Sequence, residues 1–180
     1  MNRTQLKILL DSYFPVDLNE QKARHRIFSF VEQYSKCFER SLTIGHITAS
    51  CWLINHDNTK ALLTHHKKLN IWVQLGGHCD GDSDVLRVAI KEAQEESGIK
   101  NIQAVSPEIF DIDVHLIPEN KKEAAHYHYD IRFLLQAIDD EQISISNESH
   151  DLLWVDKNVH NLPPCNESVI RMFNKWIAYK

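Results

Sequence analysis

The stretch GGHCDGDSDVLRVAIKEAQEESGIK, residues 76–100, decides the fold, because a glycine-rich segment leads directly into a helix crowded with carboxylates. Residues 84–97 carry apolar side chains at helical spacing, with polar residues before them that can cap a helix and a glycine after them. On that helix Glu92, Glu95 and Glu96 fall within a stripe about 100° wide. Like charges this close together repel one another. The spacing therefore predicts either a solvated helix face or a cation bound among the three carboxylates.

The composition of the chain is that of a soluble globular protein. It has 180 residues, 43% of them hydrophobic and 25% charged, which suits one domain with a core and a small appendage. The net charge is -5 and no basic run is longer than a pair, so a surface for nucleic acid polymers is not expected. The opening segment is too short and too polar for a signal peptide or a membrane span, and we expect a cytoplasmic protein. The cysteines lie far apart with no CxxC pair, which indicates reduced thiols.

Helical and strand-like patterns alternate along the chain. Apolar spacing predicts helices over residues 5–12, 19–38, 84–97 and 166–180, and strands over residues 46–55, 60–66, 71–75, 102–117, 126–138 and 152–155. Strands mixed with helices favour an α/β protein, with helices packed on the faces of a mixed β-sheet. We expect a helical N-terminal extension over residues 1–42 and a sheet domain over residues 43–180.

The residue types in the opening stretch suit a hard divalent cation. Mg²⁺ takes oxygen ligands and keeps several waters while it bridges to substrate phosphates, so carboxylates on one helix face suit it better than they suit zinc. Gly76 and Gly77 lie in an expected loop, where they permit a tight turn that exposes backbone atoms at close range. A helix face of three glutamates is more often a solvated surface. The joint spacing of loop and helix therefore carries the argument for a metal site.

That joint spacing resembles the Nudix box, G-x5-E-x7-R-E-U-x-E-E-x-G-U, in which U is a bulky aliphatic residue. The matching positions here are Gly77, Glu92, Glu95, Glu96, Gly98 and Ile99. The order of strands and helices after residue 46 also looks like the Nudix α/β/α sandwich. The resemblance implies a Nudix hydrolase domain over residues 43–180 and does not cover the helical extension before it.

Three positions depart from the Nudix pattern. The first consensus glutamate is Ser83, the arginine is Lys91, and the aliphatic residue after Glu92 is Ala93. In the family the arginine and the first glutamate are thought to pair and brace the loop. When both the arginine and the glutamate are absent, no buried charge is left without a partner. This is milder than the loss of only one of the two. We expect Lys91 to be able to bridge to a nearby aspartate, Asp82 or Asp84, without the bidentate geometry of arginine.

The resemblance implies a pyrophosphohydrolase that cleaves a nucleoside diphosphate linked to another moiety, NDP-X, by attack of water on phosphorus. It implies Mg²⁺ or Mn²⁺ as the cofactor and a small nucleotide-type molecule as the partner, with no nucleic acid polymer and no membrane. By position, Glu95 and Glu96 would bind the metal with the Gly76 carbonyl, while Glu92 would orient or deprotonate the water. The N-terminal helices could cap the site, form a homodimer interface or serve as scaffold.

A further acid outside the box usually completes the metal site in this family. Our candidate is Glu148, with Glu123 second, although Glu148 is equally explained as a plain loop residue. Such an acid is not fixed by the motif. It stays a prediction made from its place just before a strand-like segment.

The sequence HYHYD places His126, His128 and Asp130 on one face of an expected strand, with Tyr127 and Tyr129 on the other. The row either contacts metal or phosphate, or forms a polar sheet face opposite an aromatic one. We take both histidines as substrate-binding candidates.

Gly77 and His78, at the start of the box, are further candidates for contact with substrate. Two other functions stay open. A domain that senses a nucleotide or metabolite without catalysis would keep the fold and lose ligands, and the two polar departures from the box leave room for it. A zinc protein could instead use His126, His128 and Asp130, although a zinc site normally needs another ligand.

Overall fold

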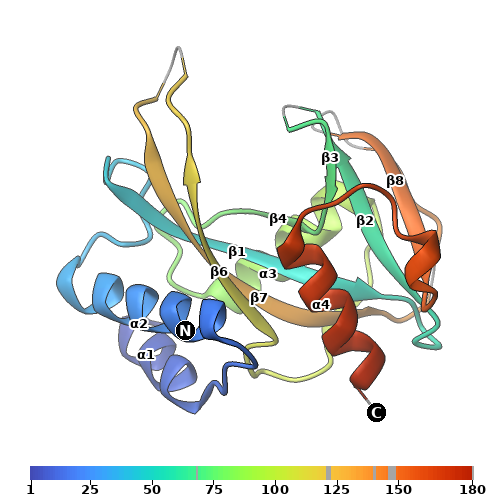
Figure 1. Cartoon of the computed structure of the whole chain (residues 1–180), viewed down its shortest axis with the longest axis horizontal. Helices are drawn as coiled ribbons and strands as arrows, with labels where there is room; N and C mark the ends of the chain where they lie inside the picture. Colours follow the sequence, from blue (N-terminus) through green and yellow to red (C-terminus); the bar gives the residue numbers. More distant parts are fainter. Residues whose placement is uncertain (68, 121–122, 140, 146–148, 180) are drawn as a thin grey trace.

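The computed structural model describes residues 1–67, 69–120, 123–139, 141–145 and 149–179 (Figure 1). Its helices are α1 (Arg3–Ser12), α2 (Leu18–Gln33), α3 (Val85–Ser97), the 3-10 turn η1 (Val159–Asn161) and α4 (Glu167–Ala178). Its strands are β1 (Gly45–Ile54), β2 (Lys60–His66), β3 (Ile71–Val73), β4 (Leu75–His78), β5 (Ile102–Ala104), β6 (Asp111–Ile117), β7 (His126–Ala137) and β8 (Ser149–Asp156). The expected α/β alternation, with helices before the first strand, is confirmed.

An eight-stranded mixed sheet forms the middle of the molecule. Its central pair, β1 and β7, runs parallel and in register from Gly45 opposite Tyr127 to Ile54 opposite Gln136. Strands β2, β3 and β8 extend the sheet from one side of β1, while β5 and β6 pair with β7 on the other. Strand β4 pairs antiparallel with the middle of β1. The glycine pair is thereby built into the sheet.

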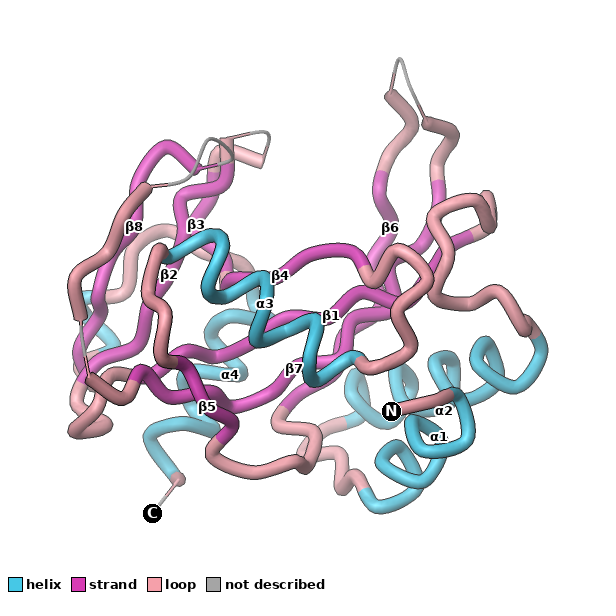
Figure 2. Tube along the Cα trace, turned by 180° about the vertical axis from the view of Figure 1, so that it is seen from behind, coloured by secondary structure: helices cyan, strands magenta, loops and turns pink. Residues whose placement is uncertain are grey.

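Helices cover both faces of this sheet, because successive side chains of a strand point to opposite faces. On one face Ile47 and Ala49 pack with α1, α2 and α3 in a single buried cluster. On the other face Trp52 and Ile54 pack with α4 in a second cluster. Figure 1 shows α4 in front of the sheet, and Figure 2, which is seen from behind, shows α3 crossing the opposite face with α1 and α2 beside it. The expected α/β/α sandwich is confirmed.

The helix predicted over residues 19–38 ends earlier, at Gln33. The residues after it serve as hydrogen-bond acceptors for other segments. The Cys37 carbonyl accepts the Ile47 N–H at 2.7 Å, and the Phe38 carbonyl accepts the Gly81 N–H at 2.9 Å. These contacts tie the end of the helical extension to β1 and to the turn before α3.

Two predicted strands are divided in the structure. The segment 71–75 breaks at Gln74, whose side chain reaches Asp130, and resumes as β4, so the glycine pair lies in a strand and not in a loop. The segment 102–117 forms β5 and β6, which pair one after the other with β7. No helix in the described parts of the chain is long and apolar enough to cross a membrane.

Candidate active site

Two glycines let strand β4 approach β1 and helix α3 at once. Gly76 has a φ of 154°, which L side chains rarely adopt, and an added Cβ would lie 2.5 Å from Ser50 Cα and 2.7 Å from the Ala49 carbonyl oxygen. Gly77 faces the opposite side of β4, and an added Cβ there would lie 2.6 Å from Glu92 Cδ. Glycine at both positions therefore sets the glutamate helix directly against the strand.

The three glutamates of α3 differ in exposure and contacts. Glu96 is 8% exposed, and its Oε2 accepts the backbone N–H of Gly76 at 3.0 Å. The Glu92 side chain is 18% exposed, whereas that of Glu95 is 59% exposed. Two carboxylates are thus held against β4, and the third reaches solvent from the same helix.

The loop between β4 and α3 is held by contacts other than an arginine–glutamate pair. Arg87 Nη2 lies 2.7 Å from Asp82 Oδ2. Asp84 caps α3 by accepting the Arg87 N–H, and its Oδ2 lies 2.8 Å from the amino group of Met1. The Ser83 hydroxyl donates to the Met1 carbonyl at 2.8 Å. Each polar residue at the start of the helix therefore has a partner.

Lys91 pairs with the catalytic candidates themselves. Its Nζ lies 3.5 Å from Glu92 Oε1 and 3.3 Å from Glu95 Oε2. The expected bridge from Lys91 to Asp82 or Asp84 is wrong, because both aspartates bind groups at the start of the helix. The lysine charge instead offsets the repulsion between neighbouring glutamates.

The oxygens of the three carboxylates do not converge on one point. Within the described part of the chain, one group of at least three potential ligands has all its ligand atoms within 4.8 Å of one another, and it consists of histidines. The glutamates nevertheless fit a hard divalent cation. Their donors are oxygens, as Mg²⁺ and Mn²⁺ prefer, and the absent Cβ of Gly77 leaves space beside Glu92. A cation bound there would reduce the spread of the carboxylates.

Strand β7 confirms the predicted faces of the HYHYD segment. His126 and His128 lie with Asp130 on one face, and Tyr127 and Tyr129 contact helix α2 on the other. The polar face continues onto β1, whose buried polar side chains lie beside the polar side chains of β7. This geometry fits both alternatives for the segment, a polar face opposite an aromatic one and a row that contacts metal or phosphate, so the choice between them stays a prediction.

Asp130 is engaged by neighbours on this face. Its Oδ1 accepts the Thr48 hydroxyl at 2.9 Å, and its Oδ2 accepts the Ser50 hydroxyl at 2.7 Å and Arg132 Nε at 2.7 Å. Gln74 donates to the same oxygen at 3.3 Å. The aspartate thus holds the polar face together and does not join the group of potential ligands around the histidines.

His46 of β1 and His78 of β4 join His128 of β7 instead. The ring centroid of His46 lies 5.0 Å from that of His78 and 4.9 Å from that of His128. Burial, with the charge of nearby histidines, lowers the pKa of His46 to about 4 and that of His128 to about 2. Burial and the charge of Arg40 also lower the pKa of His78. The three imidazoles are therefore neutral at pH 7.

The two acids predicted outside the box have different outcomes. Glu148 lies outside the described residues. Glu123 acts on the histidines, since its charge opposes the lowering of the pKa of His46 and of His78. Its part in metal binding stays a prediction.

The sequence interpretation missed a buried ion network that joins α2, β6, β7 and α4. Asp111, which is fully buried, accepts hydrogen bonds from Arg132 Nη1 at 3.0 Å and Arg171 Nη2 at 2.8 Å. Lys175 bridges Asp111 to the buried Glu20 of the helical extension. The alternation of aspartate and apolar residues in DIDVHLI was the signal that could have found it. The network secures the extension to the sheet.

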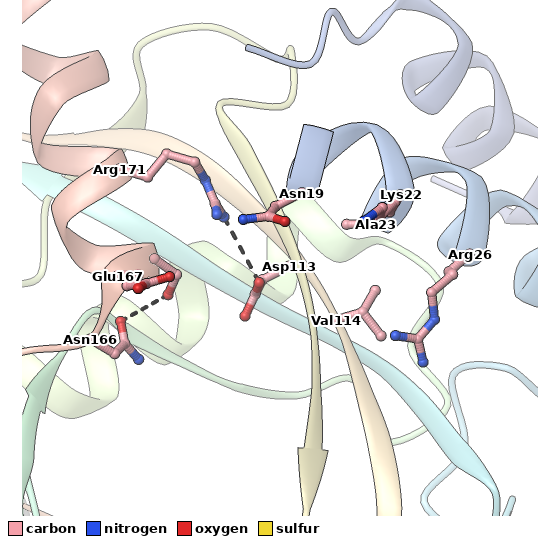
Figure 3. Close-up of a pocket in the computed structure, with 10 residues that line it drawn as sticks. Asn19, Lys22, Ala23, Arg26, Asp113, Val114, Asn166, Glu167 and Arg171 are labelled. Atoms are coloured by element: carbon pink, nitrogen blue, oxygen red, sulfur yellow. Dashed lines mark hydrogen bonds and ion pairs between the residues drawn. The ribbon is translucent and has the colours of Figure 1, made fainter. Parts of the chain in front are cut away.

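A pocket of about 480 Å³ opens beside this network, between α2, β6 and α4 (Figure 3). Its lining includes Asn19, Lys22, Arg26, Asp113 and Arg171. Arg171 Nη2 lies 3.9 Å from Asp113 Oδ1, as the dashed line in Figure 3 marks. The residues that line this pocket do not include the site residues predicted from the sequence.

Comparison with known families gives a match that spans the glutamate helix. A family model described as the NUDIX domain matches residues 45–176. The chain belongs to the Nudix family. It is a Nudix-type hydrolase acting on phosphoric anhydrides, and the matched residues include the glycine pair, all three glutamates and the histidine group. Comparison with curated proteins by sequence gave no match.

Solved structures share the fold. A NUDIX family hydrolase from Clostridium perfringens has a TM-score of 0.59 and 22% identity, covering 75% of this chain and 98% of that chain. An Ap4A hydrolase from C. elegans has a TM-score of 0.58 and 16% identity, with coverages of 73% and 95%. A UDP-X diphosphatase has a TM-score of 0.53 and 14% identity, but covers 98% of this chain and 92% of that chain. That last likeness therefore extends over the N-terminal helices.

Proposed function

We propose that this Nudix protein hydrolyses NDP-X compounds with Mg²⁺ or Mn²⁺ as cofactor. The observation that supports the proposal is the seating of Glu92 and Glu96 against Gly77 and Gly76, because it sets oxygen donors beside a strand that a phosphate chain could approach. Similar structures named as a UDP-X diphosphatase and an Ap4A hydrolase are consistent with such substrates.

The three glutamates of α3 have distinct roles in the proposal. Glu95 and Glu96 would hold the cation together with the Gly76 carbonyl. When bound, the cation neutralises the pyrophosphate and lowers the pKa of a water molecule. Glu92, which is mostly shielded from solvent beside Gly77, accepts the proton of the attacking water and keeps that water aligned with phosphorus. Phosphoryl transfer needs such positioning and charge neutralisation more than covalent help.

The sharpest experiment compares Glu95→Gln and Glu96→Gln in a panel of NDP-X compounds with Mg²⁺ or Mn²⁺ titrated. Each variant keeps the size of the side chain and removes a ligand charge, so we expect losses of at least about 100-fold in kcat/KM. Glu108→Gln is the matched control, since Glu108 is exposed and lies on the loop between β5 and β6. Undiminished hydrolysis in both Glu95→Gln and Glu96→Gln would refute the proposal.

Labelled water tests the direction of attack. Hydrolysis in H₂¹⁸O should place the label in a phosphate product, because water attacks phosphorus in the proposed reaction. Label in X released without phosphate, together with an unlabelled nucleoside diphosphate, would show attack on carbon and contradict the proposal. A chain that binds one compound tightly and hydrolyses none, with or without metal, would instead be a nucleotide or metabolite sensor.

A further inference from the structure

We propose that His46, His78 and His128 form a second metal site, which binds Zn²⁺ or another cation that prefers nitrogen ligands. The three residues come from β1, β4 and β7, which are adjacent strands. His46 stands opposite His128 in the parallel pair, and His78 stands opposite Thr48, two residues further along β1. Strand pairing therefore brings the three side chains to one place on the most regular part of the fold.

The three rings form a nearly equilateral triangle. Their centroids are 5.0 Å apart for His46 and His78, 4.9 Å for His46 and His128, and 4.9 Å for His78 and His128. One ligand nitrogen from each ring lies within 4.8 Å of the other two. Tetrahedral Zn²⁺ with bonds of about 2.0–2.1 Å needs nitrogens about 3.3–3.4 Å apart. An inward shift of less than about 1 Å by each ring would give that geometry.

The surroundings of the His46 ring indicate a bound ligand. The residue is 4% exposed, and neither Nδ1 nor Nε2 has a hydrogen-bond partner in the described part of the chain. Buried polar atoms are paired in the great majority of cases, because leaving them without a partner costs free energy. A metal ion in the triangle would take the lone pair of one of these nitrogens.

The donor set selects the class of metal. Imidazole nitrogens suit Zn²⁺, Cu²⁺, Ni²⁺ and Fe²⁺, whereas Mg²⁺ and Ca²⁺ require oxygen ligands. Three histidines leave a fourth position on Zn²⁺ open to water or substrate, as in catalytic zinc sites.

A neighbouring histidine supports His128. His126 Nδ1 lies 2.8 Å from the Ala124 carbonyl, which can only accept, so Nδ1 is the donor of that hydrogen bond. The Nε2 atom of His126 lies 3.3 Å from His128 Nε2. His126 thus acts as a positioning residue that orients the His128 ring, as hydrogen-bond partners of metal-binding histidines commonly do.

The histidine triangle is distinct from the glutamate seat. His78 and Gly77 are neighbours in β4, so they face opposite sides of the strand, and Gly77 faces Glu92. A metal held by the three histidines would therefore lie on the other side of β4 from the α3 carboxylates. The two sites can be emptied separately by substitution.

The experiment is a Zn²⁺ titration of chelator-treated protein by calorimetry, with Co²⁺ absorption as a second measure of tetrahedral nitrogen ligation. We expect one Zn²⁺ per chain in the wild type and a rise in Tm on binding. His46→Gln and His128→Gln should each lower the affinity by more than about 100-fold, because loss of a direct ligand exceeds the 10–100-fold typical of its outer partners. His78→Gln gives a third, partly exposed position should either buried variant fold poorly.

Two matched variants separate this site from the glutamates and from surface binding. His150→Gln makes the same substitution at an exposed histidine on β8, and it should bind Zn²⁺ as the wild type does. Glu96→Gln should also keep the affinity for Zn²⁺, whatever it does to hydrolysis. Three results would each overturn the proposal: no stoichiometric binding of either Zn²⁺ or Co²⁺, unchanged affinity in all three histidine variants, or loss of Zn²⁺ in Glu96→Gln.

Discussion

The adjacent glycines of β4 allow stability and activity to be changed independently. Gly76→Ala places a methyl group 2.5 Å from Ser50 Cα and 2.7 Å from the Ala49 carbonyl oxygen, at a φ of 154°. Gly77→Ala, one residue on, meets the far end of a single side chain, with Glu92 Cδ 2.6 Å away. The first substitution forces backbone against backbone, and the second displaces a carboxylate. We expect the first to unfold the protein more easily and the second to slow hydrolysis.

The magnitudes follow from these distances. At Gly76, strain in the backbone costs about 1–3 kcal/mol and overpacking about as much again, so Tm should fall by roughly 10 °C. At Gly77, Glu92 must retreat from 2.6 Å to the 3.4 Å of an ordinary contact. A displacement of roughly 1 Å at a reacting group costs about 100-fold in rate. The Tm of Gly77→Ala should change by no more than a few degrees, because the flexible glutamate can move.

The assay pairs thermal unfolding by circular dichroism with kcat/KM on the NDP-X compound found in the substrate panel. Glu92→Gln serves as the reference for loss of the carboxylate function without a methyl group. Gly77→Ala should resemble Glu92→Gln in kcat/KM and the wild type in Tm. If Gly77→Ala hydrolyses the substrate at the wild-type rate, Glu92 is not held in place by the glycine and our reasoning about the seat fails.

Three further predictions concern charge. Lys91→Ala should lower the metal concentration needed for half-maximal activity by up to about fivefold, measured by Mn²⁺ titration, since an exposed pair is worth about 0–1 kcal/mol; a higher requirement would contradict this. Arg171→Met should lower Tm by roughly 10 °C in thermal unfolding, because the buried carboxylates of Asp111 and Glu20 lose one of the cations that pair with them; an unchanged Tm would show the network to be dispensable. Burial raises the pKa of Asp111, but hydrogen bonds from Arg171 and the charges of Arg132 and Lys175 outweigh it and hold that pKa well below its usual range. The stabilisation by ionised Asp111 is therefore present above about pH 4 and is lost as the pH falls below that value. Glu20 partly opposes this pH dependence, because burial raises its pKa. Urea midpoints measured at several pH values should therefore decline less steeply with falling pH in Asp111→Asn than in the wild type.

The parts of the fold that the sequence predicted well carry redundant local signals. Helix α3 begins and ends within one residue of the prediction, because apolar spacing, the Asp84 cap and the left-handed Gly98 all agree. Strand β2 coincides with its predicted residues 60–66. The glycine pair was misjudged as a loop, since glycine permits a turn but also permits the close strand contact with Ser50 that the structure shows.

The histidine triangle could not be found from spacing along the chain. His126 and His128 were visible as a row on one strand, and Asp130 was the residue next in that row. The partners His46 and His78 enter only through the registers of β1 with β7 and of β4 with β1. Parallel pairing over so long a sequence separation has no local sequence signal. Only the folded sheet shows that His46 and His78, in place of His126 and Asp130, join His128 in the group.

Lys91 explains how the glutamate helix tolerates its own charge. One lysine lies between Glu92 and Glu95, and Glu96 is hydrogen-bonded to the backbone of β4, so each carboxylate has a compensating group before any cation arrives. The lysine and Glu95 side chains are 61% and 59% exposed, and a pair so exposed to water is worth about 0–1 kcal/mol. A divalent cation brings twice the charge to the same oxygens and can displace the lysine at little cost. Lys91 therefore gives the acidic helix face a replaceable counter-charge.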